Sequence, residues 1–277
     1  MRRLGGHELR IASIIGARGF AASVSGLAVY VVAAIGCLVS SQVMKTYLGT
    51  IRENGLITVF DPSSSAVSAP AVVAALYLAV VSSLSVARDR SSGTLEVLFY
   101  GPVNEVSYVV GKYIEQMLAC GVILGFYAIV IPLQSMLAGL GSSGRVWPTL
   151  LVALGGASAA VSLGILVSSG ARSARSSVTI MVGLLTVLLV IQGANAILDG
   201  VDLATLPAAL SYASPLISAA GRVCAYVSPF GYMAQGMNAL ARGYIIRYAG
   251  FLAASLAYSA ILLVLAVANI RRKGVKA

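Results

Sequence analysis

Residues 148–169 read PTLLVALGGASAAVSLGILVSS, a run of 22 residues without a charged side chain. An uncharged apolar run of about 20 residues is long enough, as a helix, to cross the hydrocarbon core of a bilayer. Trp147 directly precedes the run, and tryptophan favours the head-group layer at the edge of a span. The stretch therefore predicts a transmembrane helix. Small residues that predict a close packing face recur in it at intervals of four, at Gly156, Ala160, Gly164 and Ser168.

The rest of the chain has the same character. Of its 277 residues, 58% are hydrophobic and only 10% are charged, and the mean hydropathy is +0.92. Soluble domains carry about 25% charged residues, so this chain has too few charges to cover a water-facing surface. Further apolar runs predict spans at about 20–40, 69–87, 113–137, 178–198 and 250–270. In the span at 69–87, Ser68 is placed to cap the helix and Pro70 to occupy its first turn.

We therefore expect an all-α, polytopic membrane helix bundle of about six transmembrane helices, with residues 1–277 forming a single transmembrane domain. Residues 1–19 are predicted to form an interfacial helix, the alternative being a disordered tail. Its apolar face would consist of Leu4, Ile11, Ile14 and Ile15. Residues 199–248 are predicted to form short outer-side helices before the last span. A seventh span at about 204–221 is disfavoured, because prolines interrupt the segment and Ser228-Pro229 is typical of a helix start.

The distribution of Lys and Arg predicts the orientation. Six spans place both termini and the loops at 88–112 and 172–175 on one side, which then holds thirteen of the nineteen basic residues. Since basic residues accumulate in cytoplasmic loops, that side and both termini are predicted to be cytoplasmic, in a cell membrane. The six on the other side are Lys45, Arg52, Arg145, Arg222, Arg242 and Arg247.

Residue types that catalytic and metal sites require are scarce in the chain. His7 is the only histidine, and Cys37, Cys120 and Cys224 lack the spacing of a zinc or CxxC site. The only Gly-Lys pair, Gly111-Lys112, is followed by Tyr113 and does not match a phosphate-binding loop. No basic stretch is interleaved with aromatic residues as nucleic-acid surfaces are. We expect no catalytic residue, metal or cofactor on this chain and no nucleic-acid partner, although it contacts membrane lipids.

The most polar pair inside a predicted span is Gln192 and Asn195, three residues apart on one face. The two amides either hydrogen bond between helices or line a path through the membrane. An ion-coupled transporter usually needs ionisable groups within its spans. Apart from Glu115, at the cytoplasmic end of 113–137, the interiors of the predicted spans contain none.

The most distinctive polar segment is residues 87–116, ARDRSSGTLEVLFYGPVNEVSYVVGKYIEQ. Gly93 can begin a short helix from Thr94 to about Tyr100, with Glu96 supporting its first turn. Gly101-Pro102 then ends that helix, and a second helix is expected from about Asn104 into the next span. From the residues alone, the short helix is either a plain amphipathic connector or a docking element for a partner.

This segment resembles the cytoplasmic loop of type-2 ABC transporter permeases. The similarity covers an acidic and a basic residue, Gly-Thr-Leu-Glu, a later leucine and proline, and Gly-Lys entering the next span. The matching positions are Asp89, Arg90, Gly93, Thr94, Leu95, Glu96, Leu98, Pro102, Gly111 and Lys112. Asp89 stands where glutamate is more usual, and Asn104-Glu105 replaces a common Ser-Arg.

The resemblance implies a permease subunit of an exporter, in which two permeases, identical or not, form the path. It also implies separate ATPase subunits that carry ATP and Mg²⁺ and dock on the coupling loop at 88–112. The residues that it places near that contact, in transmission and not catalytic roles, are Arg88, Asp89, Arg90, Gly93, Thr94, Leu95, Glu96, Leu98 and Pro102. The alternatives are a stand-alone secondary transporter or channel, a membrane-embedded enzyme and a membrane scaffold. The Glu-Ala-Ala loop sequence of importer permeases is absent from the chain.

Overall fold

The computed structural model describes residues 6–54, 62–100, 103–139, 144–199, 219 and 221–273, and these contain helices and turns but no strand. The predicted all-α class is therefore confirmed. Residue 219 and residues 221–227 are also helical. The other helices are α1 (Gly6–Ser25), α2 (Leu27–Asn54), α3 (Pro62–Ser91), α4 (Thr94–Tyr100), α5 (Glu105–Leu137), α6 (Val146–Gly170), α7 (Ala174–Asp199), α9 (Pro229–Ala241) and α10 (Ile245–Lys273).

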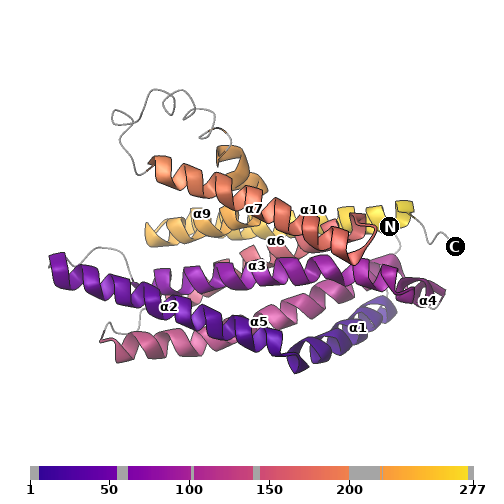
Figure 1. Ribbon diagram of the computed structural model, residues 1–277, viewed down its shortest axis with the longest axis horizontal. Coiled ribbons are helices and arrows are strands. Elements are labelled where there is room, and N and C mark those ends of the chain that lie inside the picture. The colour runs from indigo at the N-terminus through magenta and orange to yellow at the C-terminus, as the bar shows by residue number, and fades with distance from the viewer. Residues whose placement is uncertain are drawn as a thin grey trace.

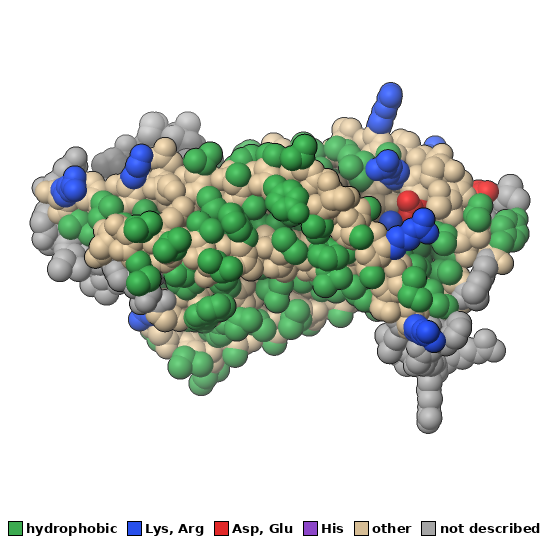
Figure 2. All heavy atoms as spheres, turned by 90° about the horizontal axis from the view of Figure 1, so that it is seen from below, with side chains coloured by type: hydrophobic (Ala, Val, Ile, Leu, Met, Phe, Trp, Pro, Cys, Tyr) green, Lys and Arg blue, Asp and Glu red, His purple; other side chains and the backbone are tan. Residues whose placement is uncertain are grey.

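Six of these helices are long and apolar enough to cross a membrane, as the sequence predicted. Figure 1 shows the long helices running side by side along one axis, with α4 at one end. A helix of 25 residues such as α6 is ~38 Å long, more than the ~30 Å of a hydrocarbon core. Figure 2 shows a surface with apolar side chains along its middle and charged ones at its two ends. The candidate spans are Leu27–Arg52, Ser65–Ser91, Glu105–Leu137, Val146–Gly170, Ala174–Asn195 and Ile245–Arg272.

Helix α6 lies at the centre of the bundle. It contacts α3, α5, α7, α9 and α10, and it is the most buried of the six spans. Its small residues make this possible. A Cβ atom on Gly156 would lie 2.9 Å from Cβ of Met233 in α9, and one on Gly164 would overlap Ser82 of α3. The small-residue face predicted from the sequence therefore packs within the subunit, where it lets neighbouring helices approach closely.

The first span lies later in the chain than predicted. Helix α1 continues past residue 20 to Ser25, the chain bends at Gly26, and α2 extends to Asn54 instead of ending near Ser40. The hydroxyls after Ser40 are satisfied within the helix, since they bond carbonyl groups one turn back, as Thr46 bonds the oxygen of Gln42 at 3.0 Å. The extension brings Lys45 into the span, two turns from the span's end.

The predicted start of the second span was also wrong. Helix α3 begins at Pro62, so Pro70 lies inside the helix, and the Ser68 hydroxyl bonds the carbonyl oxygen of Ser65 instead of capping an end. The preference of proline for a first turn thus applies to Pro62. A proline within a span is tolerated where neighbouring helices compensate the lost backbone bond, and the residues around Pro70 are buried against the bundle.

The predicted N-terminal helix forms, but it packs through a different face. Ala12 and Gly16 are buried, whereas Ile14 is 60% exposed. A Cβ on Gly16 would lie 3.2 Å from the carbonyl oxygen of Gly111, so the backbones of α1 and α5 nearly touch at this crossing. Small residues, and not the isoleucines alone, decide the contact face because they allow that approach.

Of the segment 199–248, residues 200–218 and 220 lie outside the described part of the chain, and with them most of the disfavoured seventh span. The predicted helix start at Ser228-Pro229 is confirmed. The Ser228 hydroxyl caps α9 by accepting a hydrogen bond from the Phe230 amide at 3.3 Å. The last span begins at Ile245, five residues before the predicted start, so 245–248 already belong to α10.

Candidate functional site

The candidate site lies at one end of the bundle, where α3 ends, α4 follows and α5 begins. Figure 1 shows that α1 begins and α10 ends at this same end. The chain turns from α3 into α4 at Gly93, whose φ is +71°. This left-handed conformation is costly for a residue with a Cβ atom, which explains the glycine. Ser92 and Thr94 join their hydroxyls across the turn at 2.8 Å.

Helix α4 has a buried face and an exposed face. Leu95 is 6% exposed and belongs to the core, with Leu98 packed against the core beside it. The Phe99 ring meets the Tyr108 ring of α5 edge to face, with centroids 5.9 Å apart. On the outside, Glu96 is exposed, Val97 is 73% exposed and Tyr100 is 85% exposed. Two apolar residues are therefore left uncovered on a short helix that is itself anchored to the bundle.

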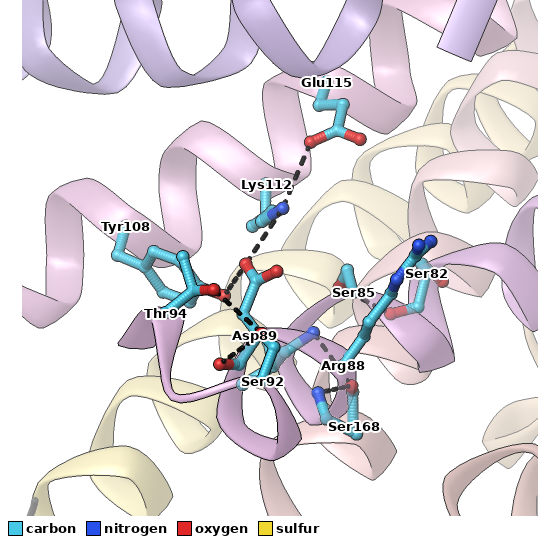
Figure 3. A network of polar contacts seen from close by, with 12 residues as sticks. Ser82, Ser85, Arg88, Asp89, Ser92, Thr94, Tyr108, Lys112, Glu115 and Ser168 are labelled. Atoms are coloured by element: carbon cyan, nitrogen blue, oxygen red, sulfur yellow. Dashed lines mark hydrogen bonds and ion pairs between the residues drawn. The ribbon is translucent and has the colours of Figure 1, made fainter. Parts of the chain in front are cut away.

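Under α4, an ionic cluster joins α3 to α5 (Figure 3). An Asp89 carboxylate oxygen, Oδ2, accepts a hydrogen bond from the Tyr108 hydroxyl at 2.7 Å and lies 3.1 Å from Lys112 Nζ. Lys112 Nζ also lies 3.6 Å from Oε2 of Glu115, one turn further along α5. All three charged side chains are largely buried, at 21%, 17% and 11% exposure for Asp89, Lys112 and Glu115. One ammonium group thus balances two carboxylates in a setting with little water.

The cluster extends to α1 through Glu115. Gly19 of α1 leaves the space that the Glu115 carboxylate occupies, since a Cβ atom on Gly19 would overlap it. Glu115 Oε1 also accepts long hydrogen bonds from Ser23 of α1, at 3.5 Å, and from Gln116, at 3.4 Å. The helix ends α1, α3 and α5 are therefore connected through three ionised side chains.

A second set of bonds fastens α3 to α6. The Arg90 guanidinium donates to the carbonyl oxygens of Ser169, at 3.3 Å, and Ala171, at 3.0 Å, where α6 ends. A cation at this position suits the negative end of a helix. The Ser168 hydroxyl of α6 accepts from the backbone amides of Val86 and Ala87, at 3.1 and 2.9 Å.

The site residues predicted from the sequence fall into distinct groups. The structure brings Asp89, Arg90 and Leu95 into contact with neighbouring helices. Arg88, Thr94 and Glu96 are exposed, and Arg88 points away from Asp89 (Figure 3). Pro102 lies outside the described residues.

Sequence reasoning did not foresee the joint role of Tyr108, Lys112 and Glu115, or the exposure of Val97 and Tyr100. The spacing of four and three residues along one helix face was the available indication for the first three.

Gln192 and Asn195 lie on α7 and do not belong to this cluster. Gln192 Nε2 and Asn195 Oδ1 are both buried and have no hydrogen-bond partner within the described parts of the chain. Asn195 packs closely against Gly221, where an added Cβ would overlap its amide. Both interpretations of the pair, a bond to another helix and the lining of a path, stay predictions.

The cluster has no features of a metal centre. Among the residues that the structure describes, no group of three or more His, Cys, Asp or Glu side chains could hold a metal ion. Gly111 and Lys112 lie within helix α5, where they cannot form a phosphate-binding loop before a helix. The cluster can transmit movement, because it connects the exposed helix α4 to several spans.

Comparison with known families agrees with this architecture. A family model described as ABC-2 family transporter protein matches residues 50–275, which covers five of the six candidate spans in full and only the last three residues of the first, Leu27–Arg52. No curated protein matches the chain. The match extends over the segment at 88–112 and over far more than half of the sequence. The chain therefore belongs to the ABC-2 family of transporters and is a membrane protein of that family.

Proposed function

We propose that this chain is the permease subunit of an ATP-binding cassette exporter and that separate ATPase subunits drive it by docking on α4. The observation that carries the proposal is the construction of α4. This helix has an uncovered apolar face, and its base is bonded to the ends of several spans. A plain connector needs neither feature.

The exposed face of α4 has the composition of a protein contact. Val97 and Tyr100 are apolar and uncovered, and Glu96 supplies a charge beside them. Aromatic residues often dominate the energy of such interfaces. We assign the direct contact to this face, with Arg88 and Thr94 at its edge, and we assign Gly93, Leu95 and Leu98 to holding α4 in place.

The bonds behind α4 supply a route for force. Movement of α4 would act on α3 directly, on α5 and α1 through Asp89 and the cluster behind it, and on α6 through Arg90. ATP and Mg²⁺ would stay on the ATPase subunits, whose closure would pull on these contacts. We place the α4 end in the cytoplasm, since most Lys and Arg residues lie there.

The path itself would lie between two permease subunits. Gln192 Nε2 and Asn195 Oδ1, which have no hydrogen-bond partner among the described residues, would line it or bond the second subunit. Cargo would move outward through this path, because the loop sequence resembles that of exporters.

Co-expression of this chain with ABC ATPase subunits from the same organism, followed by co-purification, tests the proposal. The tag is placed on this chain only, and ATP hydrolysis is measured in lipid. A variant with Val97→Ala and Tyr100→Ala should retain its fold, since both side chains are exposed. It should lower ATPase affinity about 30-fold, the effect of losing an interface residue worth ~2 kcal/mol.

Tyr30→Ala is the matched control, because Tyr30 is 53% exposed but lies on α2, away from α4. It should leave ATPase binding unchanged. If the α4 variant binds as tightly as the control, α4 is not the docking element. If no ATPase binds the unaltered chain, the exporter proposal itself is refuted.

A further inference from the structure

A groove lies at the end of the bundle opposite α4. The residues that line it differ in chemical type from those of the candidate site. The volume of the groove is about 710 Å³, within the range of about 300–1,000 Å³ typical of ligand sites. It lies between the helix at 221–227, α9 and the beginning of α10, which Figure 1 shows far from α4. The residues that characterise it are Tyr226, Tyr232, Arg242, Tyr244, Arg247 and Phe251.

Bonds between its three elements fix the shape of the groove. Gln235 Nε2 of α9 donates to the carbonyl oxygen of Ala225 at 3.1 Å, and the Tyr258 hydroxyl of α10 donates to that of Val227 at 2.7 Å. The turn from α9 into α10 closes at Gly243, whose φ is +75°. Arg242, which directly follows α9, and Arg247, in the first turn of α10, therefore line the same space.

The charged side chains that line the groove are both positive, at Arg242 and Arg247. None of the residues lining it in the described chain is acidic, and neither Arg242 nor Arg247 has a carboxylate within 4.0 Å there. The Arg247 guanidinium lies 5.2 Å from the centre of the Tyr244 ring, which orients it without neutralising it. Burial, and to a lesser extent Tyr226, raises the pKa of the Tyr232 hydroxyl, so this group stays a neutral donor. Two guanidinium groups and tyrosine hydroxyls together favour a phosphate or carboxylate.

The floor of the groove is apolar. Gly250, Phe251 and Ala254 continue it along α10, one of the six candidate spans. Ile245 and Ile246, beside the arginines, are 77% and 89% exposed, as expected for side chains that face lipid. A soluble anion would leave this apolar floor unused. A molecule with an anionic head and an apolar chain would cover both parts.

We propose that this groove binds the phosphate-bearing head group of an anionic membrane lipid. Arg242 and Arg247 hold the phosphate, and Phe251 contacts the beginning of the apolar chain. The assignment does not depend on an ATPase partner, so it and the proposed function can fail separately.

The single tryptophan of the chain gives a direct readout. Trp147 precedes Pro148, whose carbonyl oxygen accepts a hydrogen bond from Tyr248, the neighbour of Arg247, at 3.1 Å. The purified full chain is reconstituted in phosphatidylcholine vesicles, and brominated phosphatidylglycerol or brominated phosphatidylcholine is added as the quencher. Phosphatidylglycerol should quench the fluorescence at lower mole fractions than phosphatidylcholine.

Arg242→Gln with Arg247→Gln should weaken the preference for phosphatidylglycerol about 30-fold, because each cationic contact contributes roughly fivefold. The matched control is Arg52→Gln with Arg222→Gln, which removes two exposed charges outside the groove. It should keep the preference.

Three results would overturn the proposal. Equal quenching by both lipids in the unaltered chain would show that no anionic lipid is selected. If both double variants lost the preference for phosphatidylglycerol to the same extent, net charge alone would attract the lipid. Complete displacement of the brominated lipid by inorganic phosphate would indicate a site for a soluble anion.

Discussion

Replacing Lys112 with methionine should destabilise the bundle more than any other single change of a charged residue in the described chain. Methionine keeps the length of the side chain but removes the one charge that balances Asp89 and Glu115. Both carboxylates would then stay in a largely buried site without a counterion.

The magnitude follows from burial. Removing one partner of a buried ion pair typically costs about 3–5 kcal/mol. With exposures of 17%, 21% and 11%, water still screens the three groups slightly, so we expect the lower limit, ~3 kcal/mol. For a chain of this size that corresponds to a fall in melting temperature of about 6–12 °C.

A thiol-reactive dye can follow melting in detergent, because Cys120 and Cys224 are free and buried until the bundle opens. Lys45→Met is the matched control, since Lys45 is exposed and has no ion pair in the described residues. Adding Asp89→Asn to Lys112→Met should recover about 1 kcal/mol, because one stranded charge is removed. If Lys112→Met melts together with the Lys45 control, the cluster does not hold the helix ends and our reasoning about it is wrong.

Further variants test the packing and the turns by the same dye assay. Gly164→Ala should lower the free energy of unfolding by about 1–3 kcal/mol, because the added methyl group meets a backbone carbonyl of α3. Gly125→Ala, with open space around it, should be neutral or slightly stabilising, and equal melting temperatures for these two variants would contradict the packing of α6. Gly93→Ala should cost about 1–2 kcal/mol from its left-handed backbone, and a negligible effect would mean that the turn can relax. Ser168→Ala removes the acceptor of two α3 amides and should cost about 1–3 kcal/mol, whereas Ser91→Ala, at an exposed hydroxyl, should not; a match between the two would refute the clamp on α3.

The sequence predicted the number of spans because each is a long stretch that water cannot solvate. It also predicted α4 and α9, because glycine and Ser-Pro restrict the backbone locally, whatever the rest of the chain does. The predicted boundaries of α2 and α3 were wrong, because they do not depend on local sequence alone. Whether a helix continues past Ser40 or through Pro70 depends on hydroxyl bonds and neighbouring helices, which a local pattern does not contain.

Of the candidate site, the sequence indicated the segment but not its internal arrangement. Asp89 and Lys112 are 23 positions apart, and their contact depends on where α4 turns the chain. The room for Glu115 is provided by Gly19, which belongs to a helix nearly a hundred residues earlier. Contacts of this kind arise from tertiary packing, so composition and spacing on one helix could not predict them.

The crossing of α1 over α5 at Gly16 and Gly111 has a mechanical consequence. Ile114 of α5 lies against Gly16, and Ile15 of α1 lies against Gly111, so α1 and α5 interlock closely there. Helix α3 is bonded to α6 at Val86, Ala87 and Arg90, and it is bonded to α7 where the Ser177 hydroxyl donates to the carbonyl oxygen of Ser83 at 2.6 Å. The bundle therefore contains two closely joined groups of helices, α1 with α5 and α3 with α6 and α7, and the ion pair between Asp89 and Lys112 connects them. A displacement that enters at α4 should move each group nearly as a unit.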